Sequence, residues 1–499
     1  MKATRALVAR SFIALSTIVL LAALVIAAIG CHPQPAATNS VHQQAKPNIV
    51  FILADDLGYG DVGCFGQKQI LTPNIDRLAA QGVRFTQFYA GDTVCTPSRC
   101  CLITGLHTGH CNERGNGDED NPINRPTMPE ILKNAGYDTA AIGKWGIGEP
   151  DGPNVPWKVG FNFFYGYLDN VHAHNYYPTF LWRNDQKQKL PNIVPNEKPS
   201  GGGVSSNRAV YSNDLFADEA IKFLDAHKQG AVYFAHSSEP FFLYLPFTIP
   251  HANDEAAPHG TEVPDLGEYA DKDWPDVEKH FAAMVTRLDS YVGRVLDRLQ
   301  ANGLADNTLV VFTSDNGPHK EGGHDPAFFQ SWGPLRGFKR DLTEGGIREP
   351  TIIRWPGHTH ANTTSDYIGG FQDFFPTFSK IAGLPVTGLD GLNFTAAIEG
   401  NDATQPQHPY LYWEFYERGS AQAVRFDHYK AIREPMLSGK IELYDLNADL
   451  SEQHDIASKN PELVKRAEDL MKQARVPDPN WRAPAELKSG QKSEPGQSD

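Results

Sequence analysis

The stretch NIVFILADD, residues 48–56, decides the fold of this chain. Its first seven residues form a continuous apolar run rather than an alternating one, which is typical of a strand buried on both faces of a sheet. A second run of this kind, residues 308–313 (TLVVFT), continues through Ser314 into Asp315-Asn316-Gly317. Two buried strands that both end in acidic and amide side chains predict a sheet with a polar site at one edge.

Helical patterns separate these strands. Residues 73–81 predict a short helix that Gly82 closes, and apolar side chains recur at helical spacing from Val277 to Leu299. Strands that alternate with helices predict an α/β domain with a large, mostly parallel sheet flanked by helices. We place this domain at residues 47–400.

The pattern changes after about residue 400. Residues 410–416, 423–433 and 440–444 predict successive antiparallel strands, and residues 461–474 predict a terminal helix. The sequence therefore predicts a small α+β subdomain with an antiparallel sheet over residues 401–476. Residues 477–499 are rich in charged residues, Ser, Pro and Gly, which favours a flexible tail.

The N-terminus has the pattern of an export signal. Basic residues precede an uncharged, mostly apolar run at residues 11–30. Residues 28–31 (AIGC) resemble a bacterial lipobox, in which Cys31 is lipidated and becomes the mature N-terminus. We therefore expect residues 1–31 to be a lipoprotein signal and residues 32–46 a linker. The expected location is the periplasm or cell surface, with membrane association only through the N-terminal anchor. An uncleaved membrane-spanning anchor remains the alternative, because the apolar run is long enough for one.

Composition limits the class of partner. The 499 residues are enough for one large core or two domains. The formal net charge is −15, so the chain has no basic surplus with which to neutralise phosphates. We expect no nucleic-acid partner, and the sequence does not predict an oligomeric state.

The run Cys95-Thr96-Pro97-Ser98-Arg99 suits an anion site. Pro97 favours the first turn of a helix, which would put Cys95 just ahead of that helix. Free backbone N–H groups and the positive end of the helix dipole favour an anion there, such as a sulfate or phosphate ester. The planar guanidinium of Arg99 adds donors suited to paired anionic oxygens.

The acidic and amide side chains at the strand ends suit a metal ion. The carboxyl ends of parallel strands meet at one edge of an open sheet, where ligands bind. Three carboxylates and one amide oxygen are hard ligands, which calcium or magnesium prefers and zinc does not. The predicted ligands are Asp55, Asp56, Asp315 and Asn316.

Other strand ends add cationic and acid–base groups. Residues 139–143 lead into Lys144-Trp145-Gly146, and residues 242–245 lead through Pro246 to His251. The run GPLR at residues 333–336 precedes Lys339, which lies five residues before EGG at 344–346.

Together these motifs resemble the type I, formylglycine-dependent sulfatases from residue 48 to about residue 400. Within this family the chain resembles bacterial members that are similar to arylsulfatase A or N-acetylgalactosamine-6-sulfatase. The resemblance implies an alkaline-phosphatase-like α/β sandwich. It also implies that a formylglycine-generating enzyme oxidises Cys95 during maturation, and that the hydrated aldehyde attacks the sulfur of a sulfate ester.

The same resemblance assigns roles to the predicted site residues. Calcium, with magnesium as the alternative, would be held by the four oxygen ligands and by the modified Cys95. Arg99 and Lys144 would orient the formylglycine and offset the charge of sulfate. His251 and Lys339 would contact sulfate and help to protonate the leaving oxygen.

One departure from the family pattern concerns Gly146. Many relatives have a histidine at this position, which assists the release of sulfate. Another group or water must then assist this step, and His172 or His174 is the candidate group. The alternative is that both histidines contact the sugar or only cap a loop. The segments 171–177 and 318–325 also resemble those of the bacterial relatives, which implies that His172, His174 and His319 bind substrate.

The predicted function is the hydrolysis of sulfate monoesters on sulfated saccharides. Two alternatives stay open at this point. One is a phosphomonoester or phosphonate hydrolase of the same superfamily, and the other is a non-catalytic lipoprotein that binds sulfated glycans.

Six cysteines allow further chemistry. Those near the motif could form disulfides or a zinc site, although they lack the paired C-x-x-C spacing of zinc modules. If Cys31 carries lipid and Cys95 is modified, four cysteines remain for an oxidising compartment, and their pairing stays open. These are Cys64, Cys100, Cys101 and Cys111.

Overall fold

The computed structural model describes residues 46–117, 121–228 and 239–487, and the chain from Lys46 onward forms one compact unit. The predicted signal at residues 1–31, with Cys31, and nearly all of the predicted linker lie outside the described residues. Within the described residues, no helix combines the length and apolar character that crossing a membrane would need.

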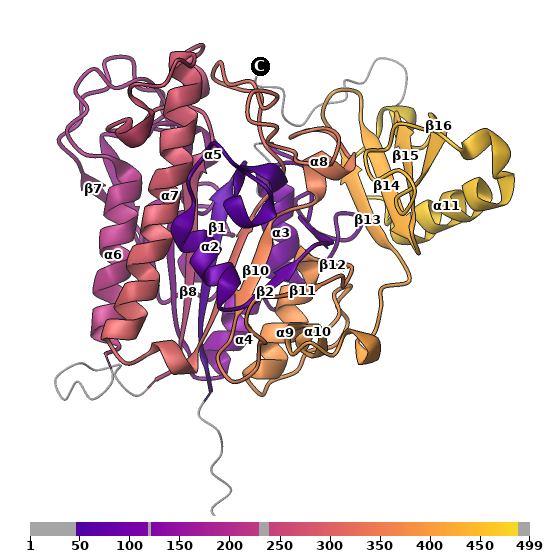
Figure 1. Cartoon of the computed structure of the whole chain (residues 1–499), viewed down its shortest axis with the longest axis horizontal. Coiled ribbons are helices and arrows are strands. Elements are labelled where there is room, and N and C mark those ends of the chain that lie inside the picture. The colour runs from indigo at the N-terminus through magenta and orange to yellow at the C-terminus, as the bar shows by residue number, and fades with distance from the viewer. Residues whose placement is uncertain (1–45, 118–120, 229–238, 488–499) are drawn as a thin grey trace, which may run out of the picture. The chain divides into compact units, whose positions relative to one another are not determined.

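A large mixed sheet forms the centre of the molecule (Figure 1). In the described part of the chain it has ten strands in the order β11-β2-β10-β9-β1-β8-β4-β5-β6-β7. The central strands β9, β1, β8, β4 and β5 run parallel, whereas β10, β6 and β7 pair antiparallel with their neighbours. The prediction of a large, mostly parallel sheet is confirmed. The bounds are β1 Asn48–Asp55, β2 Val83–Phe85, β4 Asp138–Lys144, β5 Phe163–Tyr167, β6 Phe180–Arg183, β7 Gln186–Lys189, β8 Phe241–Pro250, β9 Thr308–Ser314, β10 Thr351–Arg354 and β11 Thr363–Ser365.

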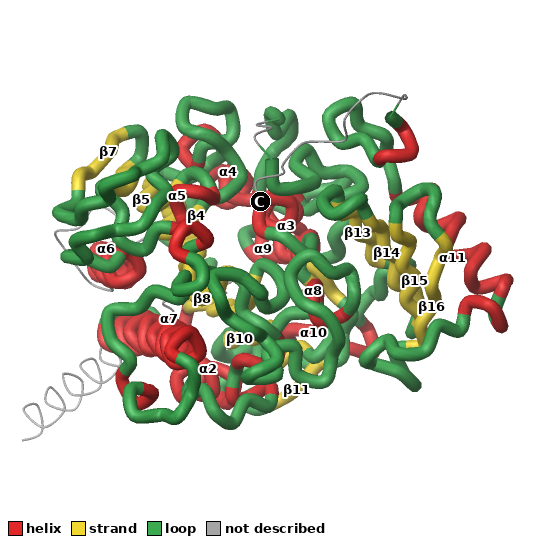
Figure 2. Tube along the Cα trace, turned by 90° about the horizontal axis from the view of Figure 1, so that it is seen from above, coloured by secondary structure: helices red, strands yellow, loops and turns green. Residues whose placement is uncertain are grey.

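Helices cover both faces of this sheet, which explains why β1 is apolar throughout. Val50 and Ile52 pack in a core with α2, α6 and α7, whereas Ile49, Phe51 and Leu53 pack in a core with α3, α4 and α9. Figure 2 shows these two sets of helices on opposite sides of the strands. The bounds are α2 Pro73–Ala80, α3 Cys95–Thr104, α4 Met128–Asn134, α5 Asn170–His174, α6 Ser212–Ala226, α7 Asp276–Ala301, α8 Glu344–Ile347, α9 Phe374–Ile381 and α10 Thr395–Ile398.

The C-terminal region has its own antiparallel sheet, as predicted, but with a different strand division. The strands are β13 Leu411–Phe415, β14 Ala421–Phe426, β15 Tyr429–Glu434 and β16 Lys440–Asp445, and α11 Pro461–Ala474 packs on them. Residues 423–433, predicted as one strand, form parts of two. Asp427, with a φ of 50°, lies in the tight turn between them. The boundary between β14 and β15 was missed because the turn between them is only two residues long and lies within an apolar pattern.

The segment predicted to be a flexible tail is partly packed. The side chain of Trp481 is fully buried, and its indole N–H donates to the carbonyl of Asn112 at 2.8 Å. Any flexible tail therefore begins later than residue 477.

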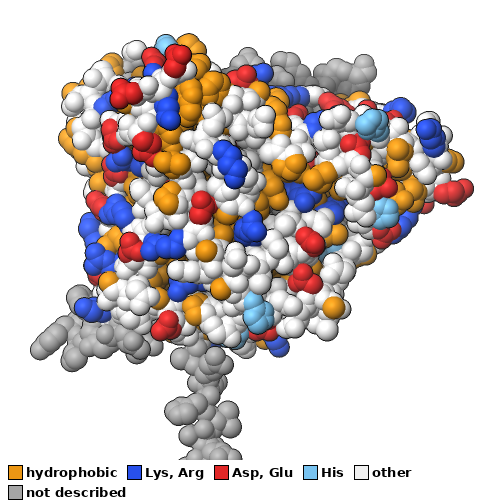
Figure 3. All heavy atoms as spheres, viewed as in Figure 1, with side chains coloured by type: hydrophobic (Ala, Val, Ile, Leu, Met, Phe, Trp, Pro, Cys, Tyr) orange, Lys and Arg blue, Asp and Glu red, His pale blue; other side chains and the backbone are white. Residues whose placement is uncertain are grey.

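The surface of the molecule carries both signs of charge. On the face drawn in Figure 3, acidic and basic side chains are interspersed.

A buried ionic cluster links the C-terminal sheet to α8. Lys430 on β15 places its Nζ 3.0 Å from Glu344 of α8 and 3.2 Å from Glu452, and all three side chains are buried. Glu344 also accepts a hydrogen bond from the hydroxyl of Tyr89, in strand β3 (Phe88–Tyr89), which pairs with β12 (Gly369–Gly370). The cluster therefore ties α8, which precedes β10 of the large sheet, to the C-terminal sheet.

Replacing Lys430 by methionine is expected to lower the free energy of unfolding by about 3–5 kcal/mol, because Glu452 would remain buried without its cation and Glu344 would keep only Arg348. Urea unfolding followed by circular dichroism would measure this. Lys440→Met is the matched control, because Lys440 pairs with Asp455 on the exposed surface and should contribute no more than about 1 kcal/mol. Equal losses in the two variants would contradict the role of the buried cluster.

Candidate active site

The nucleophile position lies at the start of α3. Cys95 is the first residue of this helix rather than the residue just before it, and Val94 occupies the extended N-cap position. The side chain is buried, and its Sγ lies 3.3 Å from Oδ1 of Asp55 at the end of β1. Burial raises the pKa of the Cys95 thiol well above its ordinary value, and Asp55 adds to this effect. In the unmodified protein without a bound metal, the raised pKa favours the protonated thiol of Cys95, which is a weak nucleophile.

Two cations hold the carboxylates around Cys95. Lys144, at the end of β4, lies 2.8 Å from Oδ2 of Asp55. Arg99 donates from Nε and Nη2 to Oδ2 of Asp315 at 2.9 and 2.7 Å, and from Nη1 to the carbonyl of Lys144 at 2.6 Å. Burial opposes ionisation of Asp55, but Lys144 and Arg99 outweigh it and hold its pKa well below the usual range.

The oxygen ligands expected for a metal converge at the ends of β1 and β9. The backbone N–H of Asp56 donates to Oδ1 of Asp315 at 3.2 Å, and the Asn316 amide donates to Oδ1 of Asp56 at 2.6 Å. Single ligand atoms of Asp55, Asp56, Cys95 and His251 all lie within 4.8 Å of one another.

Two observations indicate that a cation fits here. Oδ1 of Asn316 is buried and has no hydrogen-bond partner among the described residues. Burial, together with the charge of Asp55, raises the pKa of Asp315 to about 7 even though Arg99 pairs with it. Arg99 therefore does not offset all of the unfavourable charge and burial at Asp315, and the oxygen donors of the cluster are those that calcium or magnesium prefers.

His251 and Lys339 form the acid–base side of the site. The imidazole of His251 donates from Nδ1 to the carbonyl of Ala252 at 2.6 Å, so its Nε2 is free to accept from the Lys339 ammonium at 3.0 Å. Lys339 also pairs with Asp56 at 3.0 Å and Glu321 at 2.8 Å. Burial and the nearby Lys339 charge lower the pKa of His251 to about 4. For Lys339, burial opposes the charge, but Asp56 and Glu321 outweigh it and raise the pKa.

Two of the three histidines predicted to bind substrate adjoin this group. The ring of His174 stacks on that of His251, with centroids 4.9 Å apart, and it is partly exposed. His319 is buried, and both of its ring nitrogens are engaged: Nε2 with the carbonyl of Pro250 at 2.9 Å and Nδ1 with the backbone N–H of Glu321 at 3.1 Å. His319 therefore holds Glu321 in place and has no free ring nitrogen for substrate.

His172 does not join the site. Its ring is buried between Tyr167 and Phe180, with centroid distances of 4.8 and 4.4 Å. Burial lowers its pKa to about 3, which is expected for an imidazole in apolar packing. The expectation that His172 contacts substrate or exchanges a proton is therefore not supported.

Sequence reasoning gave no role to Glu321. It pairs with Lys339 at 2.8 Å and also with Arg340, so it fixes the ammonium that faces His251. The only signal was its place in the loop at residues 318–325.

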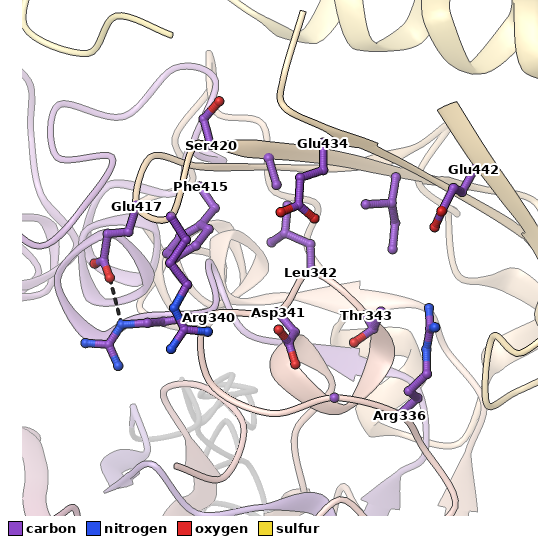
Figure 4. Close-up of a pocket in the computed structure, with 14 residues that line it drawn as sticks. Arg336, Arg340, Asp341, Leu342, Thr343, Phe415, Glu417, Ser420, Glu434 and Glu442 are labelled. Atoms are coloured by element: carbon purple, nitrogen blue, oxygen red, sulfur yellow. Dashed lines mark hydrogen bonds and ion pairs between the residues drawn. The ribbon is translucent and has the colours of Figure 1, made fainter. Parts of the chain in front are cut away.

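A hollow is lined on one side by residues of the segment 336–343, which is the segment that contains Lys339 (Figure 4). Its volume is about 370 Å³, and the C-terminal sheet supplies its other wall. Arg340, which pairs with Glu417 at 2.7 Å, forms part of the lining, and Arg336, Asp341 and Glu434 lie around it.

Comparisons with known proteins agree with this geometry. The sulfatase family model matches residues 47–384, and the model of the C-terminal region of N-sulphoglucosamine sulphohydrolase matches residues 337–476. The chain belongs to the sulfatase family, whose members are sulfuric ester hydrolases.

Two curated relatives and one solved structure illustrate the similarity. The N-acetylgalactosamine-6-O-sulfatase of Bacteroides thetaiotaomicron is 28% identical over 90% of this chain and 96% of its own length. Human arylsulfatase A is 32% identical over 77% of this chain and 74% of its own. The crystal structure of Ps i-CgsB in complex with k-i-k-neocarrahexaose has a TM-score of 0.70 and 28% identity, with 86% of this chain and 93% of that chain covered. The alkaline-phosphatase-like fold implied by the resemblance is confirmed.

Proposed function

We propose that this sulfatase hydrolyses sulfate monoesters of carbohydrates, using a formylglycine made from Cys95 and a bound calcium ion. The observation that carries the proposal is the position of Cys95. It lies at the start of α3, 3.3 Å from Asp55, between the oxygen ligands and the two cations Arg99 and Lys144. Magnesium is the alternative ion.

The two groups that the chain must acquire supply the central chemistry. A hydrated formylglycine would supply a hydroxyl nucleophile that a buried thiol lacks, and a bound metal would supply Lewis-acid polarisation of the sulfate oxygens. Asp55, Asp56, Asp315 and Asn316 would hold the metal. Their oxygen donors and the unpartnered Oδ1 of Asn316 support this assignment.

The chain's own side chains bind the anion and move the proton. Arg99 and Lys144 are fixed by their carboxylate partners, so they stabilise charge without reorganising. Lys339 presents an ammonium proton to Nε2 of His251, and this pair is suited to protonate the leaving oxygen. His174, stacked on His251 and partly exposed, is placed to contact the sugar.

A sulfated saccharide is the proposed substrate. One relative is named for N-acetylgalactosamine-6-O-sulfate, and one solved relative binds k-i-k-neocarrahexaose. The hollow lined by Arg336, Arg340 and the C-terminal sheet has charged and apolar side chains in its walls, and we propose that it binds further sugar units of the saccharide (Figure 4). Hydrolysis of defined sulfated saccharides, compared with the matching phosphate esters, tests this. Faster release of phosphate than of sulfate would favour the phosphomonoester or phosphonate hydrolase alternative. Release of neither anion would favour the non-catalytic lipoprotein that binds sulfated glycans.

The sequence also supports export and maturation steps. The apolar run at residues 11–30 and the lipobox-like residues 28–31 support an exported protein with Cys31 lipidated. A formylglycine-generating enzyme would be the partner during maturation, because it must act on Cys95.

Substituting His251 tests its role as an acid rather than as a sulfate ligand. His251→Ala should lower kcat by about a hundredfold or more on a sugar sulfate, whose leaving oxygen needs a proton, but by no more than about tenfold on an activated aryl sulfate. Lys339→Ala should show the same split. His454→Ala, at a histidine whose side chain is 80% exposed, is the control and should leave both rates unchanged. Equal losses on both substrates would assign His251 and Lys339 to sulfate binding.

A further inference from the structure

Gly146 leaves a space that another residue fills. Its φ of 69° is in the left-handed region, and a Cβ added there would lie 2.9 Å from Oδ1 of Asn170. The same Cβ would lie 3.5 Å from Cδ of Arg99 and from Cε of Lys144. The amide of Asn170 therefore occupies the place that a side chain at position 146 would take, between the two cations of the site.

The local backbone explains why Asn170 reaches this place. The N–H of Gly146 donates to the carbonyl of Leu168 at 3.0 Å, which sets the end of β4 beside the segment that leads into α5. Asp169 caps α5 by accepting from the N–H of His172 at 2.8 Å, so Asn170 is the first helical residue. Asn170, two residues before His172, thus adjoins Gly146.

The Asn170 amide is only half satisfied. Its Nδ2 donates to Oγ1 of Thr96, the neighbour of Cys95, at 2.8 Å. Its Oδ1 is buried and has no hydrogen-bond partner among the residues that the structure describes. An amide oxygen can only accept, and burying one without a donor is unfavourable.

Nearby donors are committed elsewhere. The guanidinium of Arg99 donates to Asp315 and to the Lys144 carbonyl, and the Lys144 ammonium pairs with Asp55. No described residue donates to this oxygen, and a hydroxyl introduced at residue 95 would supply the donor that it lacks.

We propose that Oδ1 of Asn170 accepts a hydrogen bond from a hydroxyl of the hydrated formylglycine at residue 95 and so orients that hydrate. Thr96 holds the amide in the required direction. Asn170 is then a positioning residue that takes the place of the missing side chain at Gly146. This inference rests on the proposed function, because it needs an aldehyde at residue 95.

The test compares Asn170→Ala with Asn170→Asp in protein whose aldehyde content is confirmed by peptide mass. Asn170→Asp keeps an acceptor oxygen at the same place, and the Thr96 hydroxyl can turn to donate to it. Two quantities are measured: kcat on an aryl sulfate, and the rate at which hydroxylamine labels residue 95 in the folded protein. The second reports how much residue 95 is free aldehyde rather than hydrate.

Asn170→Ala should lower kcat about tenfold to a hundredfold, the effect of losing one hydrogen bond to the reacting group. Hydroxylamine labelling should become several-fold faster, because the hydrate loses a stabilising bond. Asn170→Asp should stay near the wild type in both measurements. Unchanged labelling in Asn170→Ala, or an equal loss of kcat in Asn170→Asp, would overturn the proposal.

The two proposals fail separately. Wild-type protein with a confirmed aldehyde that releases no sulfate would contradict the proposed function, whatever the variants do. An active wild type whose Asn170→Ala variant is unchanged would contradict only the role of Asn170.

Discussion

Replacing Cys95 by alanine should lower kcat by at least about ten-thousand-fold, the scale of loss seen when a covalent nucleophile is removed. The reason is structural. Cys95 stands at the start of α3 with Asp55 at 3.3 Å, and among the described residues it is the only cysteine grouped with Asp55, Asp56 and His251. Steady-state release of sulfate from an aryl sulfate measures the loss.

The matched control for this substitution is Cys101→Ala on the same helix. Cys101 is buried and its Sγ lies 3.9 Å from that of Cys111, away from the carboxylates. Its loss should leave kcat within about threefold of the wild type, since it removes packing and not chemistry. A Cys95→Ala variant that retained more than about a tenth of wild-type turnover would contradict a covalent role for residue 95.

Removing the metal should have the second-largest effect. Three carboxylates gather at the ends of β1 and β9, and burial with Asp55 raises the pKa of Asp315 to about 7, so a bound cation would stabilise the ionised form of Asp315. Chelation should lower turnover by at least about a thousandfold, because the Lewis acid supplies several kcal/mol of charge stabilisation. Calcium or magnesium should restore the rate and raise the melting temperature by mass action.

Asn316→Ala provides the corresponding variant, because it removes an unpartnered amide oxygen from the cluster. It should reduce the bound calcium measured by atomic emission. Asp390→Asn is the control. Asp390 lies beside His107 and His110, a second group that could hold a metal ion. However, Nδ1 of His107 accepts a hydrogen bond from the Gly109 N–H. The proton of the neutral His107 ring is therefore on Nε2, and this nitrogen cannot bind a metal ion. If the protein bound one zinc ion per chain and needed it for turnover, the assignment of the oxygen ligands to calcium or magnesium would be contradicted.

The framework of the fold was predictable because burial on both faces leaves a clear pattern. The apolar runs at residues 48–54 and 308–313 became the neighbouring parallel strands β1 and β9, and helical spacing placed α7 and α11 within a few residues. The turn at Asp427 was not predictable, since two apolar strands separated by a few polar residues look like one long strand. The buried Trp481 was missed because its neighbours have the composition of a flexible segment.

Much of the site was predictable for a different reason. The parallel strands bring their carboxyl ends to one edge, so motifs far apart in sequence meet around Cys95. Histidines on the segment 170–177 were harder to place, because spacing alone does not show which side of a five-residue helix faces the site. His172 packs against Phe180, whereas Asn170, which drew no attention in the sequence, faces Gly146.

The chemical state of residue 95 tests the central claim most directly. Peptide mass spectrometry of freshly purified, active protein would measure the fraction of residue 95 that is aldehyde. This fraction would be compared with the turnover of an aryl sulfate in preparations that differ in the extent of modification. We expect the peptide that carries residue 95 to have an aldehyde in place of the thiol, and turnover to rise in proportion to the aldehyde fraction. Full turnover in protein whose Cys95 remains entirely a thiol would contradict the account.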